Sequence, residues 1–123
     1  MNVVDSSGWL EYLSDGPAAA FFAPAIERTS TLVVPTLSLF EVFKRVRQQR
    51  DESAALTAVA LMRQGQVVEL TESLAVSAAN VSIQHRLPMA DSIMYATAMA
   101  YDATLWTLDV DFAHLPDVQY RKR

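Results

Sequence analysis

Short apolar runs recur along the chain, and each is bounded by residues that end a strand. The run from Asn2 to Val4 ends at Asp5, and the run from Leu32 to Val34 is closed by Pro35, which cannot donate a hydrogen bond within a sheet. We expect both runs to be short buried strands. Three later runs predict strands as well: Val67, Val68 and Leu70; Leu105 to Leu108; and Val118 to Tyr120.

Between these runs, apolar residues recur at intervals of three and four, which is typical of helices with one buried face. The segments with this spacing are Phe21 to Ile26, Leu39 to Arg47, Leu56 to Arg63, Ser73 to His85 and Ala90 to Tyr101. Strands therefore alternate with helices, and the strands are apolar throughout. This pattern predicts an α/β fold, in which helices cover both faces of a mostly parallel sheet of about five short strands.

Length and composition indicate one folded domain. The chain has 123 residues, of which 51% are hydrophobic and 20% are charged, and this is enough for one core but not for two. We therefore predict a single domain over residues 1–123. No apolar stretch reaches the length of a membrane span and no signal peptide is recognisable, so we expect a cytoplasmic protein without membrane segments.

The charge balance and the absence of cysteine restrict the chemistry. The net charge is -4, from 14 acidic and 10 basic residues, which argues against binding nucleic acid mainly through a broad positive surface. A polyanionic substrate would need another source of positive charge, and a divalent cation is the simplest one. Since the chain has no cysteine, disulfides and thiolate metal sites are excluded.

Acidic residues lie where strand ends and helix starts are expected to meet. Asp5 follows the first strand and Asp109 follows the fourth. Glu41 is predicted in the first turn of the helix after the second strand, and Asp91 in the first turn of the helix that leads into the fourth. In a parallel α/β sheet these ends share one edge, where ligands usually bind. We therefore expect the four carboxylates to converge there.

Carboxylates held close together would repel and raise one another's pKa values unless a cation lay among them. Oxygen ligands without cysteine or histidine suit Mg²⁺ or Mn²⁺, which keep several waters and bridge to phosphate. Such ions activate water and stabilise the leaving oxygen when a phosphodiester bond is hydrolysed. The acid pattern thus favours a metal site with phosphodiesterase chemistry.

Each acid also has a purely structural interpretation. Ser38 and Glu41 match a capping box, in which Glu41 would accept a hydrogen bond from the Ser38 backbone amide. Asp91 would be favoured at the positive end of a helix dipole, and Asp5 could cap the helix that follows it. Asp109 could lie in an ordinary turn. Only the predicted convergence of all four favours a site.

The segments around these acids resemble the PIN-domain nucleases, and in particular the VapC-type toxins of toxin–antitoxin pairs. The matching segments are Val3 to Ser7, Ser38 to Val42, Ala90 to Ala98 and Leu105 to Phe112. They occur in the family's order and span nearly the whole chain. Where the family commonly has alanine after the third acid, this chain has Ser92, which we expect to be tolerated.

The resemblance implies a Mg²⁺- or Mn²⁺-dependent endoribonuclease that acts as the toxin of a toxin–antitoxin pair. It implies that Asp5, Glu41, Asp91 and Asp109 are catalytic, with Asp5, Asp91 and Asp109 as metal ligands. The residues that it implies in supporting positions are Ser6 and Thr107, through hydrogen bonds, and Asp111, through proximity.

The same resemblance implies a homodimer and an antitoxin partner that wraps the domain and blocks its site. Apolar side chains near the N-terminus exceed what one helical face needs, and they are candidates for a partner surface. These are Trp9, Leu10, Tyr12, Leu13, Phe21, Phe22 and Ile26. Ordinary core packing is the other interpretation of each.

Basic residues beyond Glu41 are candidates for contact with RNA. Lys44 and Arg45 lie three and four residues after Glu41, close to the same helix face. A solvated helix end, with cations near its carboxyl terminus, is the alternative. Arg121 to Arg123 are open to two similar interpretations, a frayed tail or a contact with the RNA backbone.

Two other functions are compatible with the sequence. A catalytically silent PIN-like module that binds a protein partner would account for the apolar N-terminal segment and the acidic charge. A metal-dependent DNA nuclease would share the site chemistry, because the contacts that read a 2'-hydroxyl cannot be located from the sequence. Mn²⁺ titration separates the silent module from a nuclease, since a bound ligand stabilises the folded state.

Overall fold

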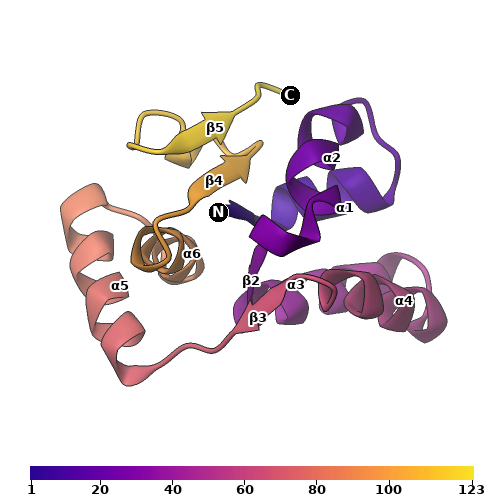
Figure 1. Ribbon diagram of the computed structural model, residues 1–123, viewed down its shortest axis with the longest axis horizontal. Coiled ribbons are helices and arrows are strands. Elements are labelled where there is room, and N and C mark those ends of the chain that lie inside the picture. The colour runs from indigo at the N-terminus through magenta and orange to yellow at the C-terminus, as the bar shows by residue number, and fades with distance from the viewer.

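The computed structural model describes residues 1–123, and strands alternate with helices along the chain (Figure 1). The strands are β1 (Asn2–Val4), β2 (Val33–Pro35), β3 (Gln66–Val68), β4 (Thr104–Thr107) and β5 (Val118–Tyr120). The α-helices are α1 (Ser6–Leu13), α2 (Ala19–Glu27), α3 (Thr36–Gln49), α4 (Glu52–Met62), α5 (Glu72–His85) and α6 (Met89–Ala100). Two short 3₁₀ helices are η1 (Thr29–Thr31) and η2 (Val110–Phe112).

All strand pairings are parallel. β4 lies between β1 and β5, with Val3 of β1 opposite Leu105 of β4. β2 pairs with β3 in a separate two-stranded sheet. A single parallel bridge between Asn2 and Leu32 joins the two sheets. The predicted parallel α/β fold is confirmed, with the five strands divided between a three-stranded and a two-stranded sheet.

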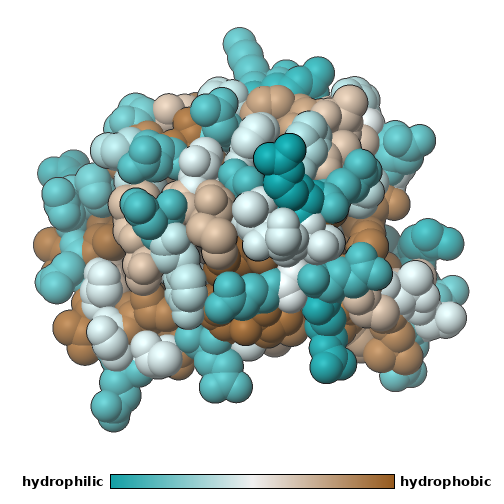
Figure 2. All heavy atoms as spheres, in the orientation of Figure 1, coloured by the Kyte–Doolittle hydropathy of each residue, from teal (hydrophilic) through white to brown (hydrophobic).

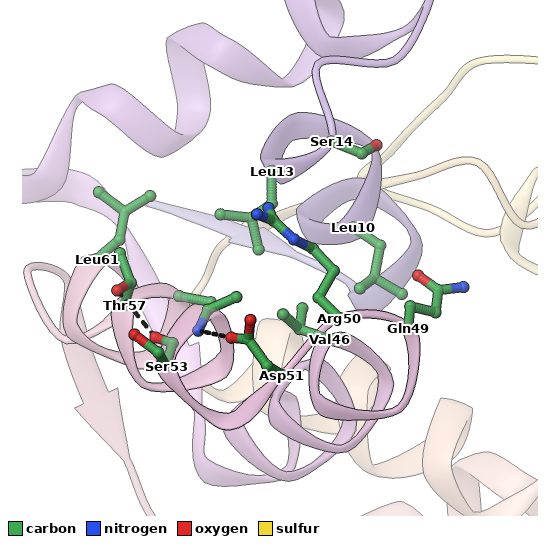
Figure 3. Close-up of a pocket in the computed structure, with 12 residues that line it drawn as sticks. Leu10, Leu13, Ser14, Val46, Gln49, Arg50, Asp51, Ser53, Thr57 and Leu61 are labelled. Carbon is green, nitrogen blue, oxygen red and sulfur yellow. Dashed lines mark hydrogen bonds between the residues drawn. The ribbon is translucent and has the colours of Figure 1, made fainter.

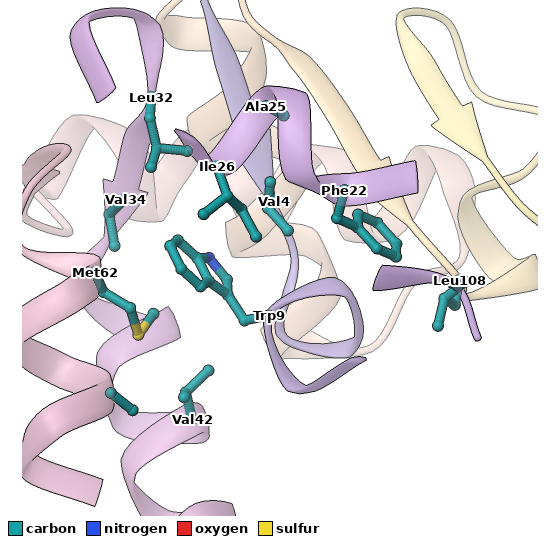
Figure 4. Close-up of a cluster of buried hydrophobic side chains, with 12 residues drawn as sticks. Val4, Trp9, Phe22, Ala25, Ile26, Leu32, Val34, Val42, Met62 and Leu108 are labelled. Carbon is teal, nitrogen blue, oxygen red and sulfur yellow. The ribbon is translucent and has the colours of Figure 1, made fainter. Parts of the chain in front are cut away.

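Apolar side chains cover both faces of the strands. Side chains alternate between faces along a strand, so Val4 and Val34 join one buried cluster with α1 to α4, while Val3 and Val33 join another with α6. Figure 4 shows the first cluster around the indole of Trp9, which is 1% exposed. Because β1 and β2 are filled on both faces, a ligand can approach them at their ends.

The apolar residues near the N-terminus belong mainly to this core. Trp9, Phe22 and Ile26 are fully buried, and the remainder pack against the same cluster while partly buried: Leu10, Tyr12, Leu13 and Phe21. Core packing therefore accounts for most of the residues that the sequence suggested as a partner surface. Leu10 and Leu13 also line a groove between α1, α3 and α4 (Figure 3).

The surface mixes polar and apolar side chains. On the face drawn in Figure 2, hydrophilic side chains project across the whole outline, and apolar surface gathers in the lower half. Several large apolar side chains are exposed, among them Phe40 and Ile83. None of the helices combines the length and the hydropathy that crossing a membrane requires.

Candidate functional site

Acids from distant parts of the chain meet beyond the carboxyl ends of β1 and β4. Asp5 follows β1, Asp109 lies two residues beyond β4, and Asp91 is in the first turn of α6. The pKa of Asp91 is raised to about 6, first by burial and then by the charges of Asp109, Asp5, Asp111 and Glu41. The structure thus brings all four acids singled out in the sequence, together with Asp111, into one electrostatic field.

Three of these carboxylates lie closest together. One oxygen from each of Asp91, Asp109 and Asp111 lies within 4.8 Å of the others. Asp91 and Asp109 are partly buried, whereas Asp111 is exposed. Three carboxylate oxygens at this spacing, open to solvent on one side, fit Mg²⁺ or Mn²⁺, which retain several waters when a protein binds them.

Asp5 is buried and held by hydrogen bonds. Its Oδ1 accepts from the Ser7 hydroxyl at 2.5 Å and from the Gly8 backbone N–H at 3.2 Å, and its Oδ2 accepts from the Thr107 hydroxyl at 2.7 Å. The bond from Gly8 makes Asp5 the N-cap of α1, so the structural interpretation also holds. Burial raises the pKa of Asp5, these hydrogen bonds oppose the rise, and the charge of Asp109 adds to it.

Thr107 connects Asp5, which follows β1, with Asp109, which lies beyond β4. Its hydroxyl donates to Asp5 and also accepts from the Asp109 backbone N–H at 2.8 Å, and the residue is fully buried. Asp109 in turn caps η2, because its Oδ1 accepts from the Asp111 backbone N–H at 2.9 Å. These are the contacts that the predicted supporting role of Thr107 requires, and they place Asp111 beside Asp109.

Glu41 is positioned by α1 and not by a capping box. The Ser6 hydroxyl donates to Glu41 Oε1 at 2.5 Å, the kind of contact predicted for Ser6. The predicted first-turn position of Glu41 is wrong, because α3 begins at Thr36, directly after β2, and Glu41 lies in its second turn. The capping-box interpretation is wrong for the same reason: Ser38 is inside the helix, and its hydroxyl contacts Met94 Sδ at 3.6 Å.

Ser7, for which the sequence predicts no role, connects Asp5 with the segment that follows β4. Its hydroxyl donates to Asp5 Oδ1 and accepts from the Leu108 backbone N–H at 3.1 Å. The signal in the sequence is only its place two residues after an acid at a helix start, where serine is common for local reasons. The pairing with Leu108 depends on β1 and β4 being neighbours.

Ser92 takes the position where the resemblance expects alanine. It is buried, and its hydroxyl lies 2.7 Å from the Pro88 carbonyl and 3.2 Å from the Leu87 carbonyl. A buried hydroxyl is tolerated when a backbone carbonyl accepts its hydrogen bond. The serine is therefore accommodated beside Asp91 without an unsatisfied polar group.

Basic side chains flank the acids. Lys44 and Arg45 are exposed, and Lys44 Nζ lies 5.8 Å from the centroid of the Phe40 ring. Arg45 lines a hollow of about 260 Å³ together with Arg123, Ser7 and other residues. Because Ser7 contacts Asp5, this hollow adjoins the acidic site.

A larger groove lies away from the acids. It measures about 570 Å³ and runs between α1, α3 and α4, as Figure 3 shows. None of the site's acids is among its 12 lining residues. Half of these residues are apolar: Leu10, Leu13, Val46, Ala54, Ala58 and Leu61. This lining suits the apolar face of a bound protein segment better than it suits a phosphate group.

The fold is shared with solved structures of low sequence identity. A toxin–antitoxin complex from Klebsiella pneumoniae is 21% identical, with a TM-score of 0.79 over 97% of this chain and 96% of that chain. VapC20 of Mycobacterium tuberculosis, described as a sarcin–ricin loop cleaving toxin, is 19% identical, with a TM-score of 0.80 over 98% and 99%. VapBC2 from Rickettsia felis, bound to a DNA fragment from its promoter, is 10% identical, with a TM-score of 0.76 over 98% and 97%.

At these identities the likeness establishes the fold alone. A search of curated proteins finds no match. The family model of the PIN domain, however, matches residues 3–118, from β1 to β5 and across every acid of the site. On that match, the chain belongs to the PIN-domain family.

Proposed function

We propose that the chain is a Mg²⁺- or Mn²⁺-dependent endoribonuclease and the toxin of a toxin–antitoxin pair. The observation that carries this proposal is the close grouping of Asp91, Asp109 and Asp111, with Asp5 and Glu41 adding charge to the same place. Membership of the PIN-domain family and the fold shared with toxin structures support it.

The residues that would hold the metal are Asp91, Asp109 and Asp5, as the family resemblance implies, and Asp111 joins them because of its position. When bound, the metal supplies the positive charge that activates water and stabilises the leaving oxygen of a phosphodiester. This charge also lets a chain of net charge -4 accept a polyanion.

The other residues of the site orient these acids and handle protons. Thr107 and Ser7 fix the carboxylate of Asp5, and Ser6 fixes one oxygen of Glu41. Glu41, which is outside the closest grouping, is the candidate to accept the proton of the attacking water through its second oxygen. Lys44 and the nearby Arg45 are candidates to contact phosphates that flank the cut bond.

The decisive experiment measures cleavage of single-stranded RNA in Mn²⁺ by the parent chain, Asp91→Asn and Asp109→Asn. We expect each variant to lose at least about 100-fold in rate, as is typical when one group that stabilises developing charge is removed. Asp102→Asn is the matched control, since Asp102 is exposed, outside the cluster, and has a φ of 54° that asparagine tolerates. Equal cleavage by all four proteins would reject the proposal.

RNA as the substrate class is supported by the sarcin–ricin loop that VapC20 is described as cleaving. A DNA strand of the same sequence, incubated in parallel, tests this part separately. Faster cleavage of the DNA would replace RNA with DNA and leave the carboxylate chemistry in place.

We also propose that the partner is an antitoxin that binds in the groove between α1, α3 and α4. Toxin–antitoxin complexes share the fold, and α1 connects the groove with the site because its N-cap is Asp5. Thr57 is exposed in this groove, so Thr57→Arg would fill it without disturbing the core. Co-purification with the product of the neighbouring upstream gene should be lost in this variant and retained in Ile83→Ala.

The homodimer expected from the family resemblance is a proposal of the same kind. Light scattering of the purified chain at micromolar concentration tests it directly. A mass of about one chain, from the 13.6 kDa of the sequence, would contradict it.

A further inference from the structure

Phe40 is an exposed aromatic ring beside the acidic site. It lies in α3, one residue before Glu41, and is 62% exposed. Neighbouring residues of the same helix contribute to the core: Val42 is fully buried in the first cluster, and Leu39 packs against it. Phe40 belongs to neither buried cluster. An aromatic side chain of this size is usually buried, so the fold itself gives no reason for this one.

A positive charge accompanies the ring. Lys44 Nζ lies 5.8 Å from the centroid of Phe40. Lys44 follows Phe40 by four residues and Glu41 by three, so it is a neighbour of both on the helix surface. An accessible ring and an ammonium group therefore lie together on α3, and Glu41, whose charge acts on Asp91, follows the ring by one residue.

We propose that Phe40 stacks on a nucleobase of the RNA next to the bond that is cut, while Lys44 contacts the adjoining phosphate. This inference rests on the proposed nuclease function and adds to it how the substrate strand is held. Proteins bind single strands by combining aromatic rings that stack on bases with cations that follow the backbone. Stacking needs an unpaired base, so the substrate segment would be a loop or a single strand.

Contact with another protein is the competing use of this surface, and the charges disfavour it. A protein interface that covered Phe40 would also remove Lys44 and Glu41 from water, which is costly for charges without buried partners. An RNA strand would instead place a phosphate next to Lys44 and a nucleobase on the ring of Phe40. The chemistry on this part of α3 therefore favours nucleic acid.

The test measures binding in the full chain carrying Asp109→Asn, so that RNA is not consumed. The probes are unstructured ten-nucleotide RNAs, each with one 2-aminopurine at a different position, whose fluorescence falls when the base stacks. We expect quenching at one or two positions. Adding Phe40→Ala should abolish this quenching and weaken binding by about 5- to 150-fold, the range measured when one stacking side chain is removed.

Two further substitutions separate stacking from apolar contact. Phe40→Trp should retain both the affinity and the quenching, whereas Phe40→Leu, which keeps apolar volume without an aromatic ring, should behave like Phe40→Ala. Ile83→Ala is the matched control, because Ile83 is 80% exposed and lies on α5, not on the helix that carries Phe40 and Lys44. Its affinity should equal that of the parent.

Several outcomes would overturn the inference. Unchanged affinity in Phe40→Ala would do so, as would full affinity in Phe40→Leu. A change of oligomeric mass in Phe40→Ala with unchanged RNA affinity would assign the surface to a protein contact. In the chain without Asp109→Asn, Phe40→Ala should raise KM for RNA cleavage with little change in kcat. If this variant cleaves RNA with an unchanged KM, the stacking role is rejected and the nuclease proposal stays intact.

Discussion

Asp5 and the three acids that face it carry the same kind of charge in different surroundings. Asp5 is 7% exposed, and two hydroxyls and a backbone amide donate hydrogen bonds to its two oxygens. Asp91, Asp109 and Asp111 instead lie with oxygens within 4.8 Å of one another, and Asp111 is exposed. One carboxylate is satisfied by the protein, and three are crowded together.

This difference indicates that the protein alone fixes Asp5, whereas a bound ligand would complete the surroundings of the three crowded acids. Burial and hydrogen bonds fix Asp5, which suits an acid whose orientation must not change. The pKa of Asp91 is raised first by burial and then by repulsion from the neighbouring acids, among them Asp109 and Asp111. A divalent cation bound among these acids would relieve that repulsion. Each prediction below acts on one side of this contrast.

The largest expected effect on stability is that of Asp5→Ala. This substitution removes the N-cap of α1 and leaves the Ser7 and Thr107 hydroxyls without their acceptor, so we expect a loss of about 2–4 kcal/mol in the free energy of unfolding. Asp111→Ala should change it by less than about 0.5 kcal/mol, as is usual at an exposed position. Urea unfolding in EDTA measures both, and equal losses would remove the contrast.

Mn²⁺ should stabilise the chain through the three crowded acids. At a concentration of about 100 times the Kd, mass action predicts a gain of about 2.7 kcal/mol, which corresponds to about 10 °C in Tm for a domain of this size. Asp109→Asn should lose most of this gain, and the control Asp102→Asn should keep it. A parent chain whose Tm does not respond to millimolar Mn²⁺ would favour the silent PIN-like module.

Thr107→Val removes one hydroxyl while keeping the shape of the side chain. Asp5 then loses a donor and the Asp109 backbone N–H loses an acceptor, so we expect a loss of about 2 kcal/mol in stability. RNA cleavage should also fall, because both acids are less well oriented. Thr107→Ser, which keeps the hydroxyl and lacks the methyl group, should retain most of the stability and most of the RNA cleavage. If it does not, the packing of the methyl group accounts for the effect.

The smallest effect concerns Asp91 in the protein without metal. Its pKa is about 6 in the folded chain against 3.8 in the unfolded chain, so the folded state binds the proton more tightly. The resulting stability is fully present below pH 3.8 and is lost as the pH rises through about 6. After allowance for solvent screening of this partly buried group, charged Asp91 costs about 1 kcal/mol at pH 7.5.

Asp91→Asn should therefore stabilise the chain in EDTA by about 1 kcal/mol at pH 7.5 and by much less at pH 4. Urea unfolding at the two pH values measures this difference. A gain that is the same at both pH values would show that the charge of Asp91 is not its origin.

Much of the fold follows from local sequence, because the strands are short apolar runs with clear ends. β1 and β5 have the predicted bounds, and β2 and β4 lie one residue from theirs. In β2 the shift places Pro35 inside the strand, opposite Val68, and not beyond it. The division into two sheets could not be predicted from local sequence. It arises because β1 and β2 are connected only by a single long-range bridge, between Asn2 and Leu32.

The site was less predictable than the fold. The predicted placement of Glu41 is wrong because α3 begins at Thr36 without a side-chain cap, so no local signal marks the start of this helix. The close approach of Asp111 depends on the turn that Asp109 caps, and the role of Ser7 depends on β4 lying beside β1. The contact of Ser7 with Leu108 is set by tertiary structure, and no local spacing encodes it.

The contacts of the Thr107 hydroxyl determine when the acidic site can form during synthesis. It joins Asp5, which follows β1, to Asp109, which lies beyond β4, and β1 pairs along its length only with β4. A chain still growing beyond Asp91 therefore lacks both the strand that holds Asp5 in place and the acid that faces it. The acidic site therefore forms only after β4 has been synthesised and has paired with β1.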